Sequence, residues 1–193
     1  MSEIPRQEET ESFINPIEIN HETFMRGEPI AAMDFTLING LRPEKHRQEL
    51  GQLPKERDDN NIHKSHRPDR VSLGKGNLIK NAASMEEFGG EGNVIYIIDK
   101  QIEQSKTFRP NSEHPNNAEF LIKGVGSNAI KGIIVHNKDM EKVKTRIQDI
   151  KKSLYNKINL GDKDIEELKK KITLIDSLSI ISFEDQMEKE KNN

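Results

Sequence analysis

The stretch GVGSNA at residues 124–129 has the residue spacing of a phosphate-binding loop. It fits the relaxed dinucleotide fingerprint G-x-G-x-x-[GA], in which glycines let the backbone approach a pyrophosphate. Glu119 lies just upstream, and a carboxylate can accept a sugar hydroxyl's hydrogen bond and stabilise a developing positive charge. Two incompatible interpretations follow. Either the glycines bind a dinucleotide, or they join two strands and the chemistry belongs to Glu119.

The elements around the glycines decide against the phosphate loop. Such a loop lies between a strand and a helix whose N-terminus faces the pyrophosphate. AEFLIK at 118–123 could be the strand, but the following NAIKGIIVHN is rich in β-branched residues and interrupted by Gly132. The sequence therefore predicts that Gly124 and Gly126 are turn glycines between two strands. GKGN at 74–77 lacks the Lys-Ser/Thr ending of a Walker loop and is predicted to be a turn.

The remaining polar candidates each have a simple structural interpretation. Glu119 alternates with Ala118 and Phe120, so the period of a strand could place it on a solvent-facing surface. His63 and His66 form a His-x-x-His pair, but without further ligands of suitable spacing we expect loop residues and no metal site.

Hydrophobic periodicity predicts the elements that would position these residues. Strands are expected at 22–30, ending at Pro29, and at 93–99, 118–123 and 130–137, with a short extended piece after Arg70. Helices are expected up to Gly40, at 77–89, and as an amphipathic hairpin over 143–158 and 165–178. Gly161 would end the first hairpin helix and Asp162 would cap the second, whereas 42–70 is predicted to be a long polar connection. Phe88 and Tyr96 are predicted core residues.

Composition narrows the class of protein. The chain has 193 residues, of which 32% are hydrophobic and 33% charged, with a formal net charge of −3 and no cysteine. We therefore expect no general nucleic-acid binding, no disulfides and no cysteine chemistry. No run of about 18 apolar residues predicts a membrane span, and the first residues lack the pattern of a secretory signal.

Three separated segments, taken in order, resemble the mono-ADP-ribosyltransferase toxins of the cholera and pertussis class, the R-S-E family. They are FMRGEP around Arg26, DRVSLGKGNLIKNAASM around Ser72, and HPNNAEFLIKGVGSNAIKGIIVHN around Glu119. The likeness spans roughly residues 22–137. The third segment is the best local match, because its His-Pro, its glutamate, its glycines and the following Ile-x-Gly strand all agree with the cholera-type enzymes.

The resemblance implies that NAD is the substrate. Arg26, with Gly27 beside it, would bind a phosphate or ribose oxygen through a rigid cationic fork of donors. Ser72 would orient Glu119, and Glu119 would bind the ribose 2′-hydroxyl and place its charge near the cation that forms as nicotinamide leaves. His66, or alternatively His63, would line the NAD site. The simpler alternatives are a surface arginine and an ordinary strand or turn serine.

Two positions depart from the family pattern. The Ser-Thr-Ser element reads SLG here, so only Ser72 is kept. The paired glutamates of arginine-modifying members are replaced by Asn117-Ala118-Glu119, and asparagine at this acceptor-positioning place cannot act as a general base. The resemblance therefore implies a non-arginine acceptor, NAD hydrolysis, or a catalytically silent relative.

The predicted architecture is an α+β fold with an ADP-ribosyltransferase-like split β-sheet core and a C-terminal helical hairpin. Its parts are a flexible acidic tail at 1–20, the transferase-like domain at 21–138, a hairpin at 139–180 packing on the core or a partner, and a charged tail at 181–193. In the split-sheet core, the strand after Glu119 would pair with the next through the glycine-containing turn.

The acidic C-terminal segment resembles those of bacterial effectors exported by type IV secretion, although a disordered solubilising tail has the same composition. We therefore expect a host-directed virulence effector that leaves the bacterium without a signal peptide and modifies a host protein in the host cytoplasm. Otherwise it would stay in the bacterial cytoplasm. The alternatives are a silent binding module acting through residues 139–178, or an antitoxin-like or immunity-type partner protein.

Overall fold

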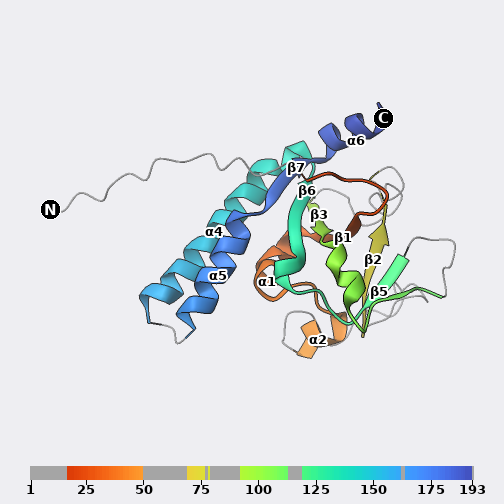
Figure 1. Cartoon of the computed structure of the whole chain (residues 1–193). Helices are drawn as coiled ribbons and strands as arrows, with labels where there is room; N and C mark the ends of the chain where they lie inside the picture. The colour runs from red at the N-terminus through yellow and green to blue at the C-terminus, as the bar shows by residue number, and fades with distance from the viewer. Residues whose placement is uncertain are drawn as a thin grey trace.

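A seven-stranded, mostly antiparallel sheet organises the part of the chain that the computed structural model describes, residues 17–49, 69–76, 78, 92–112, 119–161 and 164–192. The strand order is β4-β5-β2-β1-β3-β6-β7, and only β6 and β7 run parallel. The fold is therefore mixed α/β with helices toward the C-terminus, as Figure 1 shows.

The strands are β1 (Phe24–Pro29), β2 (Val71–Lys75), β3 (Asn93–Ile98), β4 (Arg109–Pro110), β5 (Glu119–Ile122), β6 (Ile130–Val135) and β7 (Ser179–Ser182). The α-helices are α1 (Met33–Asn39), α2 (Glu44–Glu49), α4 (Met140–Asn159), α5 (Ile165–Asp176) and α6 (Phe183–Lys191). Short 3-10 helices are η1 (Ile30–Ala32), η3 (Lys100–Gln104), η4 (Ser127–Ala129) and η5 (Asn137–Asp139).

Both faces of the central strands are covered, which explains the nearly continuous apolar run of β3. Tyr96 and its alternating neighbours lie in a large cluster with residues of α1, α4 and α5. Ile95 and Ile97 point to the other face, into a smaller cluster with Ile19 and residues of α6. The prediction of a buried strand at this place is confirmed, and so is Tyr96 as a core residue.

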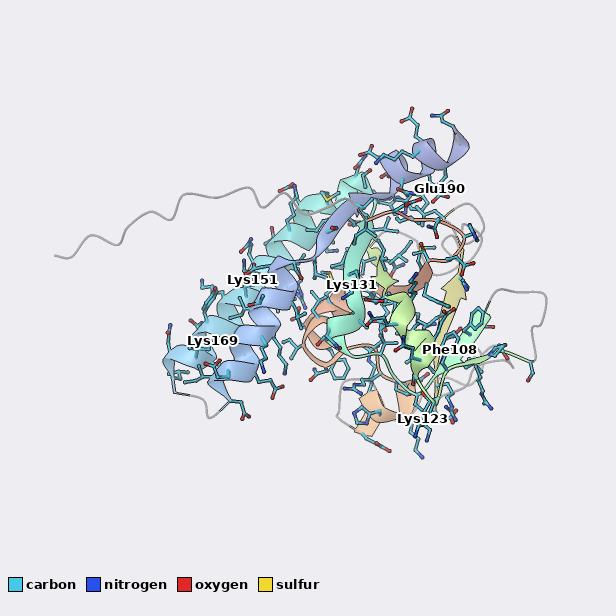
Figure 2. The ribbon with its side chains drawn as sticks, viewed as in Figure 1. Phe108, Lys123, Lys131, Lys151, Lys169 and Glu190 are labelled. Atoms are coloured by element: carbon cyan, nitrogen blue, oxygen red, sulfur yellow. The ribbon has the colours of Figure 1, made fainter. Side chains whose placement is uncertain are left out.

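The helical hairpin packs on the sheet of its own chain. Its inward-facing residues, Val143, Ile147, Ile150, Leu154, Leu168, Ile172 and Ile175, belong to the large cluster. Figure 1 shows α4 and α5 side by side along one side of the sheet. Figure 2 shows Lys151 and Lys169 on this hairpin, on the opposite side of the molecule from Phe108.

The described residues nearest each end of the chain contribute to the fold more than the sequence suggested. The predicted tail at 181–193 instead completes β7 and forms α6, because Phe183 and Met187 pack against the smaller cluster. Glu190 of α6 accepts a hydrogen bond from the Leu78 backbone N–H at 3.1 Å. At the other end, Ile19 is buried, so the predicted flexible tail does not extend to residue 20.

The helix stops were predicted correctly where glycine supplies them. Gly40 ends α1 with a φ of 80°, and a Cβ there would lie 2.1 Å from the Val125 carbonyl oxygen. Gly161 follows α4 with a φ of 76°. The second hairpin helix has Asp164 at its N-cap, one residue before Ile165, and the predicted cap Asp162 lies outside the described residues.

Two predictions about connections were wrong. The polar stretch after Arg42 contains the short helix α2. More importantly, β5 and β6 do not pair with each other, since β2, β1 and β3 lie between them. The glycine segment instead crosses the end of the sheet, where Val125 forms a bridge with Leu41. The helix predicted at 77–89 lies outside the described residues apart from Leu78.

Candidate functional site

The site lies where β1 and β2 separate. β1 pairs with β3 along its whole length, from Phe24 to Pro29. With β2 it forms only two residue pairs, Phe24 with Lys75 and Met25 with Gly74. Beyond these pairs the two strands no longer hydrogen-bond as a ladder, so polar backbone groups of β2 face a gap and need other partners.

Arg26 is the first residue of β1 past the last pair, and its side chain bridges this gap. Its Nη1 donates a hydrogen bond to the backbone carbonyl of Ser72 at 3.2 Å, whereas its Nε is buried and has no partner among the described residues. Burial lowers the pKa of the Arg26 guanidinium, and the carboxylates of Glu28 and Glu119 act in the opposite direction. Because arginine has so high a pKa in water, it remains a cation here.

Glu119 is held by donors from both neighbouring strands. Gly74 lies opposite Glu119 and Ser72 opposite Leu121, so Ser72 and Glu119 are diagonal neighbours on one face. The Ser72 hydroxyl donates a short hydrogen bond to Glu119 Oε1. The Asn111 amide nitrogen, Nδ2, donates to Glu119 Oε2 at 2.7 Å.

This geometry defines what the carboxylate could do. Glu119 is half-buried, so the fully solvent-facing interpretation of the strand pattern is wrong. Each of its oxygens already has one donor, and an ionised carboxylate has roughly four acceptor positions. It could therefore still bind a ligand hydroxyl while its negative charge stabilises a nearby cation.

A buried polar cluster lies behind Arg26 on the same side of β1. Glu28, two residues further along, accepts a hydrogen bond from the Thr36 hydroxyl at 2.6 Å and pairs with Arg47 Nη1 at 3.4 Å. Arg47 also lies over the Phe35 ring, 5.3 Å from its centroid. Burial, and secondarily the negative charge of Glu28, raise the pKa of Tyr96 well above its ordinary value. The carboxylates of Glu28 and Glu119 therefore both act on the Arg26 guanidinium through their charge.

The structure brings together Arg26, Ser72 and Glu119, which come from three different strands. Gly27 follows Arg26 and pairs with Ile95, so it lies on the face opposite to Arg26, and by register this is the face of Ser72 and Glu119. The other sequence-predicted residues, Asn117, His63 and His66, lie outside the described residues.

Sequence reasoning missed three polar residues of this region, namely Asn111, Glu28 and Arg47. The proline- and asparagine-rich stretch RPNSEHPNN was a usable signal for Asn111, because it favours a turn between two extended segments. A hairpin centred on that stretch places Asn111 beside Glu119, as the antiparallel pairing of β4 and β5 does.

Among the described residues, no group of three or more histidine, aspartate or glutamate side chains could hold a metal ion. No helix in the described part of the chain is both long and apolar enough to cross a membrane.

Comparison with known proteins leaves the function to be argued from the geometry. No protein-family model matches this chain, and no curated protein matches it either.

Proposed function

We propose that this chain is an NAD-dependent mono-ADP-ribosyltransferase that modifies a protein at a non-arginine acceptor. The observation that carries the proposal is the meeting of Arg26, Ser72 and Glu119 where β1 and β2 separate, with Ser72 donating to Glu119. These residues are predicted from the sequence and lie far apart in it, Ser72 being 46 residues after Arg26 and 47 before Glu119. A meeting of all three is not expected if each is an ordinary surface residue.

The residues have chemically distinct tasks in the proposed reaction. The guanidinium of Arg26 binds the negatively charged diphosphate or a ribose oxygen of NAD, for which a planar fork of donors is well suited. Glu119 accepts a hydrogen bond from the 2′-hydroxyl of the nicotinamide ribose. Ser72 holds the Glu119 carboxylate in position for that contact.

The proposed step exchanges one bond at the ribose C1′ for another. The C1′–nitrogen bond to nicotinamide breaks, and its electron pair leaves with the ring nitrogen, which becomes neutral. The sugar then has the character of an oxocarbenium ion, which the nearby charge of Glu119 stabilises. A lone pair of the acceptor forms the new bond to C1′, and the acceptor's proton passes to solvent.

The acceptor is inferred from Asn117, two residues before Glu119. Asparagine can hydrogen-bond an acceptor but cannot take its proton, so an arginine side chain would not be activated. The proposal is therefore a non-arginine side chain, with water as the competing acceptor. Reaction with water would make the chain an NAD glycohydrolase using the same three residues.

The assignment as a host-directed effector is part of this proposal. It rests on the family resemblance and on the acidic C-terminal segment. Because that segment forms α6 and packs on the sheet through Phe183 and Met187, a secretion signal located there would have to detach before it is recognised. Fusing residues 181–193 to a translocation reporter tests whether the segment alone suffices for export. Failure of the fusion to be exported would remove this support.

Labelled NAD tests the reaction. The purified chain is incubated with NAD labelled on the adenylate phosphate and with a cell lysate, and both protein labelling and free nicotinamide are measured. Glu119→Gln and Arg26→Lys are each expected to reduce the signal about 100-fold or more, because they remove charge stabilisation and the planar fork respectively. Glu141→Gln, at an exposed position of α4, is the matched control and should not change it.

Each result of this experiment has a definite meaning. Label transfer that both variants abolish, while circular dichroism shows them folded, supports the transferase. Free nicotinamide without labelled protein identifies water as the acceptor. If the wild-type chain produces neither product, the enzyme proposal is wrong and the chain is a binding protein with a transferase-like site.

A further inference from the structure

Asn111 lies directly after β4 and is nearly enclosed, with 3% of its surface exposed. It contacts Glu119 at two points. Its backbone N–H donates to the Glu119 carbonyl at 2.9 Å, and its side-chain Nδ2 donates to Oε2 at 2.7 Å. The backbone hydrogen bond fixes the main chain of Asn111 relative to β5. The Asn111 side chain therefore has little freedom to move away from the Glu119 carboxylate.

Ser72 and Asn111 hold the carboxylate from opposite sides. β5 has β2 as one neighbour and β4 as the other, and each neighbour contributes one donor to a different oxygen. A carboxylate with one donor can still turn about its terminal bond, whereas donors on both oxygens fix its plane. Hydrogen bonds to an ionised acceptor are also roughly twice as strong as neutral ones.

We propose that Asn111 is a second positioning residue for Glu119, equivalent in importance to Ser72. This inference rests on the proposed function, in which Glu119 binds the ribose hydroxyl and faces the developing cation. A displacement of about 1 Å in a catalytic group can reduce the rate about 100-fold. Since Glu119 acts chiefly in the transition state, loss of the Asn111 donor reduces kcat and leaves KM for NAD nearly unchanged.

Two substitutions separate the donor from the shape of the side chain. Asn111→Ala removes both, whereas Asn111→Asp keeps the shape and replaces the donor with an acceptor. We expect each to lower kcat by about 10- to 100-fold with KM changed less than about threefold. Asn111→Asp should be at least as harmful as Asn111→Ala. Asn128→Asp, at an exposed position of η4, is the matched control.

A second measurement tests the contact without relying on enzymatic activity. In Asn111→Asp two carboxylates lie against each other, so they repel when both are ionised and share a proton in acid. The cation of Arg26 interacts with Glu119 and favours the ionised carboxylates, so it weakens their repulsion without removing it. The loss of stability caused by Asn111→Asp should therefore be smaller at about pH 5 than at about pH 8. Adding Glu119→Gln should reduce this difference, leaving only the part caused by burial of the new carboxylate.

The outcomes distinguish this inference from the proposed function. If the wild-type chain consumes NAD and both Asn111 variants keep its kcat, the inference is wrong and the function stands. If the wild-type chain consumes no NAD, the function is wrong, and the stability measurement decides the positioning role. A pH effect that depends on Glu119 then supports the contact, and its absence overturns it.

Discussion

The two sides of β1 differ in how completely they are closed. Toward β3 the strand forms six residue pairs, and β3, β6 and β7 continue the sheet with apolar side chains on both faces. Toward β2 it forms two pairs and then separates, and the side chains beside the gap are Arg26, Ser72 and Glu119. β1 thus lies between two parts of the same sheet. We call β3, β6 and β7 the closed half, and β2, β5 and β4 the open half.

The difference shows how a small protein can hold charged groups partly out of water. An arginine and two carboxylates beside a sheet cost desolvation energy, which is recovered only if each group has well-placed partners. The closed half holds β1 rigidly through its ladder and its apolar contacts. The open half can then leave backbone groups of β2 to be satisfied by the Arg26 side chain.

The largest effect on stability is expected in the closed half. Ile133 lies at the centre of β6 and is completely buried. Ile133→Ala should lower the free energy of unfolding by about 2–5 kcal/mol, because it removes buried methyl groups and leaves a cavity. Urea denaturation followed by circular dichroism measures this change. NAD turnover per folded molecule should be unchanged, and a selective loss of turnover would show that the halves are not separable.

Glu119→Gln in the open half is expected to reduce turnover strongly and stability only slightly. In the proposed reaction the substitution removes the negative charge that faces the developing cation, so kcat should fall about 100- to 1,000-fold, equivalent to about 3–4 kcal/mol. Steady-state kinetics with NAD measures it. Urea denaturation of the same sample should show a smaller change in stability than Ile133→Ala does. A variant that unfolds more readily than Ile133→Ala would contradict the division of roles.

A smaller effect is expected behind the site, where Thr36 supports Glu28. Both side chains are buried, and the Thr36 hydroxyl donates to the carboxylate at 2.6 Å. Thr36→Val keeps the approximate shape but removes this donor, so the free energy of unfolding should fall by about 1–3 kcal/mol. Thr173→Val, at an exposed position of α5, is the control. Equal stability of Thr36→Val and wild type would mean that Glu28 has sufficient support from Arg47.

The closed and open halves also differ in how well their strands and helices could be predicted from the sequence. The closed half has strong periodic signals: β3 and α5 occur within the predicted segments, and α4 extends beyond the predicted 143–158 at both ends. β4 was missed because two residues are too few to show a period, and β7 because its residues were assigned to the end of the hairpin and to the charged tail. The pairing of β5 with β6 was predicted wrongly because closeness in sequence favours a hairpin. Three other strands separate them, and β5 pairs with β2 and β4.

The site itself could not come from local patterns. Ser72 is 46 residues from Arg26 and 47 from Glu119, so no helical or strand period relates them. Only their order and their neighbours, compared with the R-S-E family, suggested that they meet. Glu28 and Arg47 carried no such motif, and their burial depends on how α1 and α2 pack against β1.

The smallest effect, and one of opposite sign, is expected for Tyr96→Phe. Tyr96 is completely buried; its hydroxyl makes no well-formed hydrogen bond among the described residues, although the Thr36 side chain lowers its pKa against the effect of burial. An unpartnered buried hydroxyl loses its contacts with water, so Tyr96→Phe should equal the wild type or exceed it by up to about 1 kcal/mol in the free energy of unfolding. Tyr155→Phe, at a half-exposed position of α4, is the matched control. A loss of more than about 1 kcal/mol in Tyr96→Phe would show that the hydroxyl has a partner, such as an enclosed water.

The pH dependence of the stability of wild type and Tyr96→Phe tests the electrostatics of the buried residues around Glu28. Burial and the charge of Glu28 raise the pKa of Tyr96 in the folded state above its value in the unfolded chain. The associated stability is therefore fully present below about pH 10 and is lost as the pH rises toward the folded-state pKa. Tyr96→Phe has no such group, so its advantage over the wild type should grow by about 1.4 kcal/mol per pH unit above about pH 10. An advantage that stays constant through this range would mean that the Tyr96 hydroxyl ionises as readily in the folded chain as in water.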